Sequence, residues 1–114
     1  MDVHQSPVYD SFNLSKVRNE MRVGKVTFRV HAIRRMFERG VTEEDVRLVL
    51  RNGEVIGDYP DDTPYPSCLM LGWCNDRPVH VVAASNHDEK ETIVVTVYEP
   101  DPAKWDTAFR SKRK

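Results

Sequence analysis

The apolar residues of this chain change their spacing near its midpoint, and this change constrains the fold more than any other feature. Before it, Ala32, Ile33, Met36 and Phe37 recur at the spacing of a helix. After it, runs of β-branched and aromatic residues are separated by short turns, as in a sheet. This division favours the α+β class, in which short helices pack on a curved antiparallel sheet built from the second half.

Two short helices are expected between Val30 and Asn52. Gly40 stands where a left-handed C-terminal cap would end the first helix. Thr42 and Asp45 form a variant of the capping box that would start the second. The predicted inner faces of the two helices carry the large apolar residues Ile33, Met36, Phe37, Val46, Val49 and Leu50.

Two further elements are expected in the N-terminal part. Residues 10–23 predict a helix with a thin apolar stripe of Leu14, Val17 and Met21. The segment Lys25–Val30 alternates polar and apolar residues and predicts a short strand before the two helices.

Four strands of an antiparallel sheet are expected in the second half, because the turns between most of them are short. The run Ile93–Val97 is apolar on both faces and fits a central position. Trp105 and Phe109 are expected to return over an edge of the core, and residues 110–114 to form a basic tail. The predicted strands are Glu54–Tyr59, Cys68–Trp73, Val79–Ala84 and Thr92–Tyr98.

Length and composition favour one domain and exclude a membrane span. A chain of 114 residues can bury one core but not two. Its apolar runs fall short of the roughly 20 residues that cross a bilayer. A secretory signal is not visible, so a cytoplasmic location is expected. The net charge of −1 gives no general attraction to nucleic acid, so any such binding needs a local patch.

Three potential cations share one face of the first of the two helices. His31, Arg35 and Arg39 are spaced i, i+4 and i+8. Like charges at this spacing repel each other weakly, and a phosphate would relieve that repulsion. Pairing of the arginines with Glu38 would instead make this an ordinary solvated face.

Two strands carry the other polar residues of interest. His80 begins the run His80–Val82, where a histidine is commonly a satisfied, half-buried side chain. Tyr98 ends the last predicted strand and shares a face with Thr96. A tyrosine in that place commonly keeps its ring on the core and its hydroxyl in water.

A zinc site made of Cys68, Cys74, His80 and His87 has suitable ligand types but unsuitable spacing. The two cysteines lie six residues apart on an extended segment that spans about 20 Å. The chain also lacks a glycine-rich phosphate loop, a nucleophile elbow and an HExxH motif. We therefore expect no metal, no other cofactor and no disulfide.

Short motifs follow one another in a specific order over residues 26–105. They are His31-Ala32, Arg35-Met36, Arg39–Thr42, Asp45-Val46, Gly53–Ile56, Tyr59-Pro60, Pro66, His80–Val82, Thr96–Pro100 and Trp105. In this order they resemble the family called domain of unknown function 4258. The resemblance implies a fold similar to the RelE-like and barnase-like ribonuclease toxins. It also implies a small antitoxin as partner, either DNA-binding or with a zinc-finger head.

On this resemblance, the expected function is that of the toxin in a type II toxin–antitoxin pair, which cleaves RNA without a metal. A base would take the proton of the 2′-hydroxyl, an acid would protonate the leaving oxygen, and cations would stabilise the phosphate. The expected catalytic residues are His31, His80 and Tyr98, and the expected RNA phosphate-binding residues are Arg35, Arg39 and Thr96.

The alternative is a non-catalytic protein-binding module, or an inactive member of the same fold. The enzyme hypothesis predicts that the histidines and arginines converge in one open groove. The binding hypothesis predicts that polar groups are satisfied internally and that an exposed apolar patch is centred on Trp73, Tyr65 or Trp105.

Overall fold

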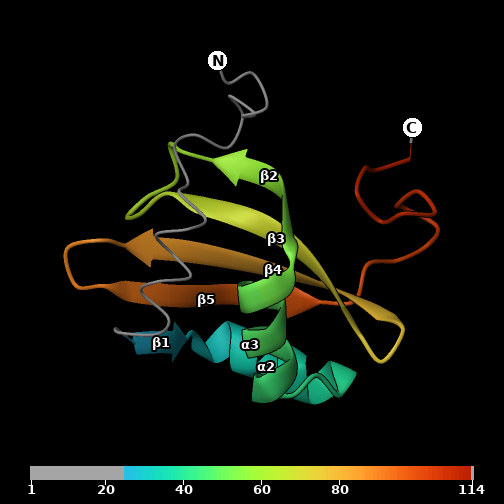
Figure 1. The fold of residues 1–114 in the computed structure, drawn as a ribbon, viewed down its shortest axis with the longest axis horizontal. Helices are drawn as coiled ribbons and strands as arrows, with labels where there is room; N and C mark the ends of the chain where they lie inside the picture. The colour runs from blue at the N-terminus through green and yellow to red at the C-terminus, as the bar shows by residue number, and fades with distance from the viewer. Residues whose placement is uncertain (1–24, 114) are drawn as a thin grey trace.

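The computed structural model describes residues 25–113, which form one sheet with two helices (Figure 1). The helix expected over residues 10–23 lies outside the described residues. In chain order the elements are β1 (Lys25–Phe28), α2 (Val30–Arg39), α3 (Glu43–Asn52), β2 (Glu54–Tyr59), β3 (Ser67–Cys74), β4 (Arg77–Asn86) and β5 (Glu91–Tyr98).

The sheet has five strands in the order β1-β5-β4-β3-β2 and is mixed. The strands β2 to β5 pair antiparallel through their short connections, as expected. The first strand differs, because β1 lies at the far edge and runs parallel to β5, with Lys25 opposite Glu91. The prediction of about four antiparallel strands is therefore wrong at this edge. A pairing across more than sixty residues leaves no local turn signal in the sequence.

Both helices end where the sequence indicates, and α3 also begins there, whereas Val30, assigned to the preceding strand, is the first residue of α2. Gly40 adopts φ 65° after α2, and its N–H group turns back toward the carbonyl groups of Met36 and Phe37. The Thr42 hydroxyl accepts from the Asp45 N–H, and the Asp45 carboxylate accepts from the Thr42 N–H, both at 3.0 Å. This capping box satisfies two backbone donors, at the start of α3 and at its cap residue.

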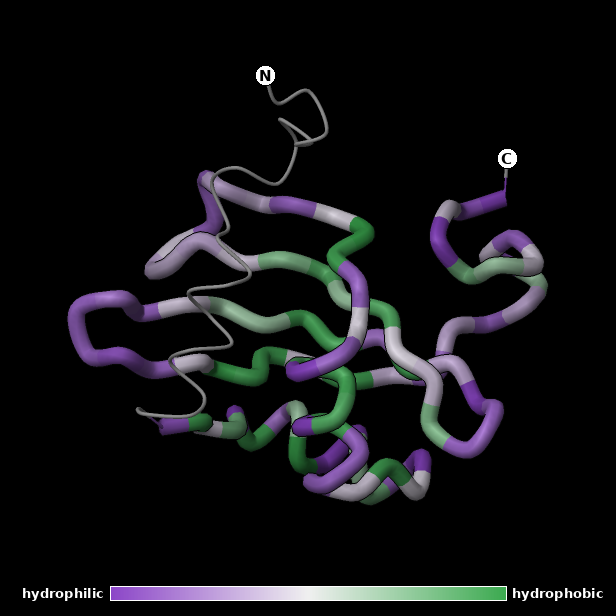
Figure 2. The backbone as a smooth tube through the Cα atoms, viewed as in Figure 1, coloured by the Kyte–Doolittle hydropathy of each residue, from purple (hydrophilic) through white to green (hydrophobic). Residues whose placement is uncertain are grey.

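Close contact between α3 and β3 depends on glycine. A Cβ atom at Gly72 would lie 2.6 Å from Cγ2 of Val49, and one at Gly53 would lie 2.7 Å from the Leu71 carbonyl oxygen of β3. The helix therefore packs with Val49 directly on the backbone of the sheet. In Figure 2 the hydrophobic part of the backbone runs through the central strands beneath the helices.

The core lies between the two helices and one face of the sheet. Val46, Val49 and Leu50 of α3 are buried, which confirms the prediction for this helix. For α2 the prediction is confirmed at Met36 and wrong at Ile33 and Phe37, which are exposed, while the small Ala32 lies inside. The buried sheet residues of this core are Cys68, Met70, Cys74, Val79, Val81, Ala83, Val94 and Val97.

The chain after β5 folds back onto the sheet. Trp105 is buried, as expected. The expected basic tail is not free over its described part, since the Arg113 N–H donates to the Lys104 carbonyl at 2.8 Å and Trp105 forms a bridge with Lys112. Within residues 25–113, no helix is long and apolar enough to span a membrane.

Candidate functional site

His80 and the helices lie on opposite faces of the sheet. Its neighbours Val79 and Val81 both belong to the core beneath the helices. Successive side chains of a strand point to opposite faces, so the imidazole points away from α2 and α3. Tyr98 is the cross-strand partner of His80, and Thr96 pairs with Val82 two residues along the same strand. His80, Thr96 and Tyr98 therefore share one face, as the sequence predicts for the last two.

His80 is fully buried, and both its ring nitrogens have partners. Nε2 lies 2.8 Å from the Phe109 carbonyl oxygen, which can only accept, so Nε2 carries a proton. With a neutral ring, Nδ1 then accepts a hydrogen bond from the Tyr98 hydroxyl, 3.2 Å away. The Trp105 ring meets the imidazole edge-on with 4.5 Å between centroids.

The surroundings of this pair keep both side chains neutral. Burial lowers the pKa of His80, and the opposing effect of its hydrogen bond to the Phe109 carbonyl is smaller. Burial also raises the pKa of Tyr98. A neutral imidazole beside a protonated phenol is a suitable base–acid pair, but here the imidazole lone pair is engaged and solvent does not reach the ring.

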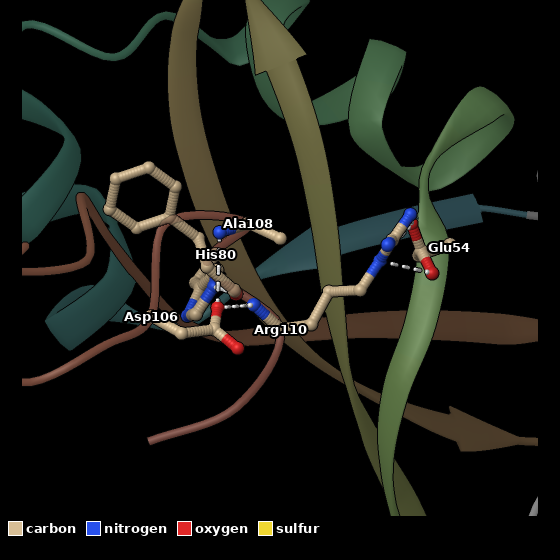
Figure 3. Close-up of polar contacts among 6 residues, drawn as sticks. Glu54, His80, Asp106, Ala108 and Arg110 are labelled. Atoms are coloured by element: carbon tan, nitrogen blue, oxygen red, sulfur yellow. Dashed lines mark hydrogen bonds and ion pairs between the residues drawn. The ribbon is translucent and has the colours of Figure 1, made fainter. Parts of the chain in front are cut away.

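The cover over His80 is the segment 105–113, which we call the C-terminal strap. The Phe109 ring contacts Trp73 edge-on at 5.9 Å, and the Arg110 guanidinium binds the Glu54 carboxylate with contacts of 2.9 to 3.0 Å. Figure 3 shows the strap turning beside His80 and Arg110 extending to Glu54 of β2. Phe109 adopts φ 59°, an unusual conformation for a bulky residue.

The Asp106 carboxylate holds the turn of the strap. Its Oδ1 atom accepts from the N–H groups of Ala108 and Arg110, at 3.1 and 3.2 Å (Figure 3). The Phe109 N–H donates to the Asp106 carbonyl at 3.0 Å. These bonds fix the Phe109 carbonyl where the His80 ring can donate to it.

The other predicted residues lie on α2, on the helical side of the molecule. His31, Arg35 and Arg39 are all exposed. Arg35 pairs with Glu38 at 3.3 Å, as expected for an ordinary solvated helix face. The cationic face therefore exists, but the sheet separates it from His80. The structure brings together His80, Thr96 and Tyr98 in one group and His31, Arg35 and Arg39 in another.

Sequence reasoning missed an exposed apolar surface on α2. Val30, Ile33 and Phe37 are 71%, 52% and 89% exposed. We call these three residues the α2 apolar stripe. The sequence carried a signal for it. On a helical wheel at 100° per residue, the apolar residues of α2 cover an arc of about 160°, with Ala32 at one end and Val30 at the other. That arc is wider than one contact with a sheet requires.

Three large side chains elsewhere bear on the binding hypothesis. Trp73 is 51% exposed, Tyr65 is half-buried and Trp105 is buried. Trp73 adjoins a groove of about 370 Å³ that is lined by Leu48, Glu54 and the backbone of Gly72, among others. Among the large apolar side chains of the described region, Phe37 nonetheless has the highest exposed fraction.

The two cysteines are buried free thiols. Burial raises the pKa of the Cys68 thiol, as does the nearby Asp58 carboxylate. The Cys74 thiol donates weakly to the Asp45 carbonyl at 3.7 Å. Among residues 25–113, no three histidine, cysteine or acidic side chains are grouped to hold a metal ion.

These observations define an α+β domain with two short helices on one face of a five-stranded mixed sheet and a histidine–tyrosine pair beneath a strap on the other. The chain belongs to the family described as domain of unknown function (DUF4258), whose model matches residues 28–99. No curated protein and no solved structure matches the chain significantly. The matched region includes both groups of predicted residues but ends before the strap.

Proposed function

We propose that this chain is a protein-binding domain that works as one half of a two-protein pair, with α2 as its binding surface. The carrying observation is a contrast between two sets of side chains. His80 is fully buried with both nitrogens bonded, whereas the α2 apolar stripe leaves Phe37 89% exposed. The His80 ring therefore has its hydrogen bonds within the chain, whereas the apolar side chains of the stripe are not covered by the described residues.

Exposure of the stripe is unfavourable unless a partner covers it. Burying one large apolar side chain is worth about 1.5–3 kcal/mol. Single exposed apolar residues are ordinary, but three on one short helix form a contiguous patch of the kind that marks an interface. Because the stripe lies on a capped helix held by core contacts, it is presented without needing to fold on binding.

The partner of this pair is proposed to be a small antitoxin-type protein encoded beside this chain. The test is co-expression of the two proteins and measurement of their affinity by calorimetry. Phe37→Ser should weaken the complex about tenfold or more, because it removes the most exposed apolar anchor. Leu48→Ser, at an apolar residue 38% exposed on α3, is the matched control and should leave affinity unchanged. Equal affinities of wild type and Phe37→Ser would rule out the stripe.

Metal-independent RNA cleavage is the second candidate function. The observation that favours it is the neutral His80 ring within 3.2 Å of the Tyr98 hydroxyl. With the strap moved aside and the ring proton shifted to Nδ1, Nε2 of His80 could take the 2′-hydroxyl proton, and Tyr98 could protonate the leaving 5′-oxygen. His31 lies on the other side of the sheet, so this mechanism leaves it no catalytic role. Arg35 and Arg39 would bind RNA outside the reacting centre.

The cleavage candidate predicts a specific loss of activity. Tyr98→Phe keeps the ring and removes the acid, so RNA cleavage should fall by about a hundredfold or more. Cleavage is measured on labelled single-stranded RNA in the presence of EDTA, with His31→Ala as a control expected to retain activity. If wild type does not cleave RNA, or if Tyr98→Phe cleaves as fast as wild type, the candidate is excluded.

A further inference from the structure

The charges around the α2 apolar stripe point to one kind of partner. Resting on the proposed protein-binding function, we infer that the stripe receives an acidic amphipathic helix, with apolar residues on one face and carboxylates on both flanks.

The stripe has the spacing that a helix recognises. Val30, Ile33 and Phe37 stand at positions i, i+3 and i+7, so they form one line along the helix. The helix has 10 residues and a length of about 15 Å. A second helix laid along it can offer apolar residues at the complementary i, i+3, i+4 and i+7 positions. Its apolar face would cover Phe37, the most exposed residue of the stripe.

The stripe has an exposed arginine on each side. From Arg29 to Arg39 the chain carries four exposed arginines against one glutamate, and two of these arginines, Arg29 and Arg34, border the stripe. On the helical wheel, Arg34 and the cap residue Arg29 lie about 70° to either side of the stripe. Arg35 and Arg39 lie on the opposite face of the helix, about 150–170° from the stripe, and Glu38 pairs with Arg35. A partner with carboxylates on both flanks of its apolar face would therefore meet a cation on each side.

Other occupants of the stripe lack this complementarity. The first 24 residues of the chain carry three acidic residues, Asp2, Asp10 and Glu20, balanced by the basic residues Lys16, Arg18 and Arg22. A second copy of this chain would bring the same arginines and would repel them. The positive border contrasts with the net charge of −1 of the whole chain, so it is a local feature of α2. Charge therefore favours a separate, acidic chain.

The test uses two synthetic helical peptides of about 18 residues. One has leucine at the i, i+3, i+4 and i+7 positions and glutamate elsewhere, and its twin has lysine in place of every glutamate. Fluorescence anisotropy with the full chain measures both affinities. The acidic peptide should bind at least about tenfold more tightly than the basic twin, and its affinity should fall as sodium chloride is raised.

Variants locate the binding on the stripe. Phe37→Ser and Arg34→Glu should each weaken the acidic peptide about tenfold, whereas Leu48→Ser should have no effect. Equal binding of the two peptides, or binding unaffected by Phe37→Ser and Arg34→Glu, would overturn the inference. Concentration-dependent dimerisation lost in Phe37→Ser would show a second copy as occupant and would also overturn it. So would a lower thermal midpoint of Phe37→Ser, since the chain itself would then cover the stripe.

Failure of this inference and failure of the proposed function give different results. If the neighbouring protein binds through Phe37 but the peptides show no preference for acidic charge, protein binding stands and the acidic partner is wrong. If Phe37→Ser changes neither the binding of the neighbouring protein nor the binding of the acidic peptide, both the proposed function and the acidic partner are wrong.

Discussion

At His80, a residue type suited to catalysis occupies a position suited to structure. Its ring joins three parts of the chain, because Nδ1 accepts from Tyr98 on β5, Nε2 donates to Phe109 in the strap, and Trp105 packs on it. Removing either hydrogen-bond partner would leave a buried nitrogen unsatisfied, at a cost of about 1–3 kcal/mol. The ring thus holds the strap to the sheet.

The neutral state of His80 gives the fold a pH dependence. Burial lowers its pKa in the folded protein, while the unfolded chain takes up a proton near pH 6.5. The stabilising effect of the neutral ring is therefore complete above about pH 6.5 and is lost as the pH falls from there toward the lowered folded pKa.

This dependence is measured by thermal unfolding between pH 7.5 and pH 5, values chosen to lie on either side of about 6.5. His80→Gln is the control, since glutamine does not titrate and can still donate a hydrogen bond toward the Phe109 carbonyl. The midpoint of wild type should fall more steeply with acidity than that of His80→Gln. Parallel curves for the two proteins would contradict a neutral, buried His80.

At the scale of elements, the two helices differ in how closely they bind the sheet. The α3 helix rests directly on Gly72 through Val49, and its inner face is fully buried. The α2 helix buries only Ala32 and Met36 among its side chains, and it turns Val30, Ile33 and Phe37 outward. One helix is therefore mainly structural, and the other leaves an apolar face exposed.

The α3 contact predicts a large effect from one methyl group. Gly72→Ala would place Cβ 2.6 Å from Cγ2 of Val49, so either the helix or the side chain must move. We expect a loss of about 1–3 kcal/mol in the free energy of unfolding, measured by urea denaturation. The double variant Gly72→Ala/Val49→Ala should lose less than the sum of the two single variants, because the second change makes room for the first. Strict additivity would show that Val49 is not the obstacle.

At the scale of the whole molecule, local signals were predictable and distant pairings were not. The end of α2 at Gly40, the capping box at Thr42 and the hairpin strands follow from neighbouring residues. The parallel pairing of β1 with β5 and the binding of Arg110 to Glu54, 56 residues apart, depend on tertiary packing. The same reason explains the candidate site. Tyr98 and Thr96 could be placed on one face from strand alternation, but the strap over His80 could not.

The molecule as a whole separates two surfaces that the sequence had suggested as one. The sheet lies between the cationic helix and the His80–Tyr98 pair, so a single ligand of modest size does not reach both. We propose that the first surface binds a partner, while the second holds the strap to the sheet.

The most direct test maps the surface that the neighbouring protein contacts by NMR. The ¹⁵N-labelled chain is titrated with the unlabelled partner, and backbone amide shifts are followed. We predict that the largest changes fall on Val30–Arg39, with β4, β5 and the strap little affected. Changes concentrated around His80, Tyr98 and Phe109, with α2 unaffected, would contradict it.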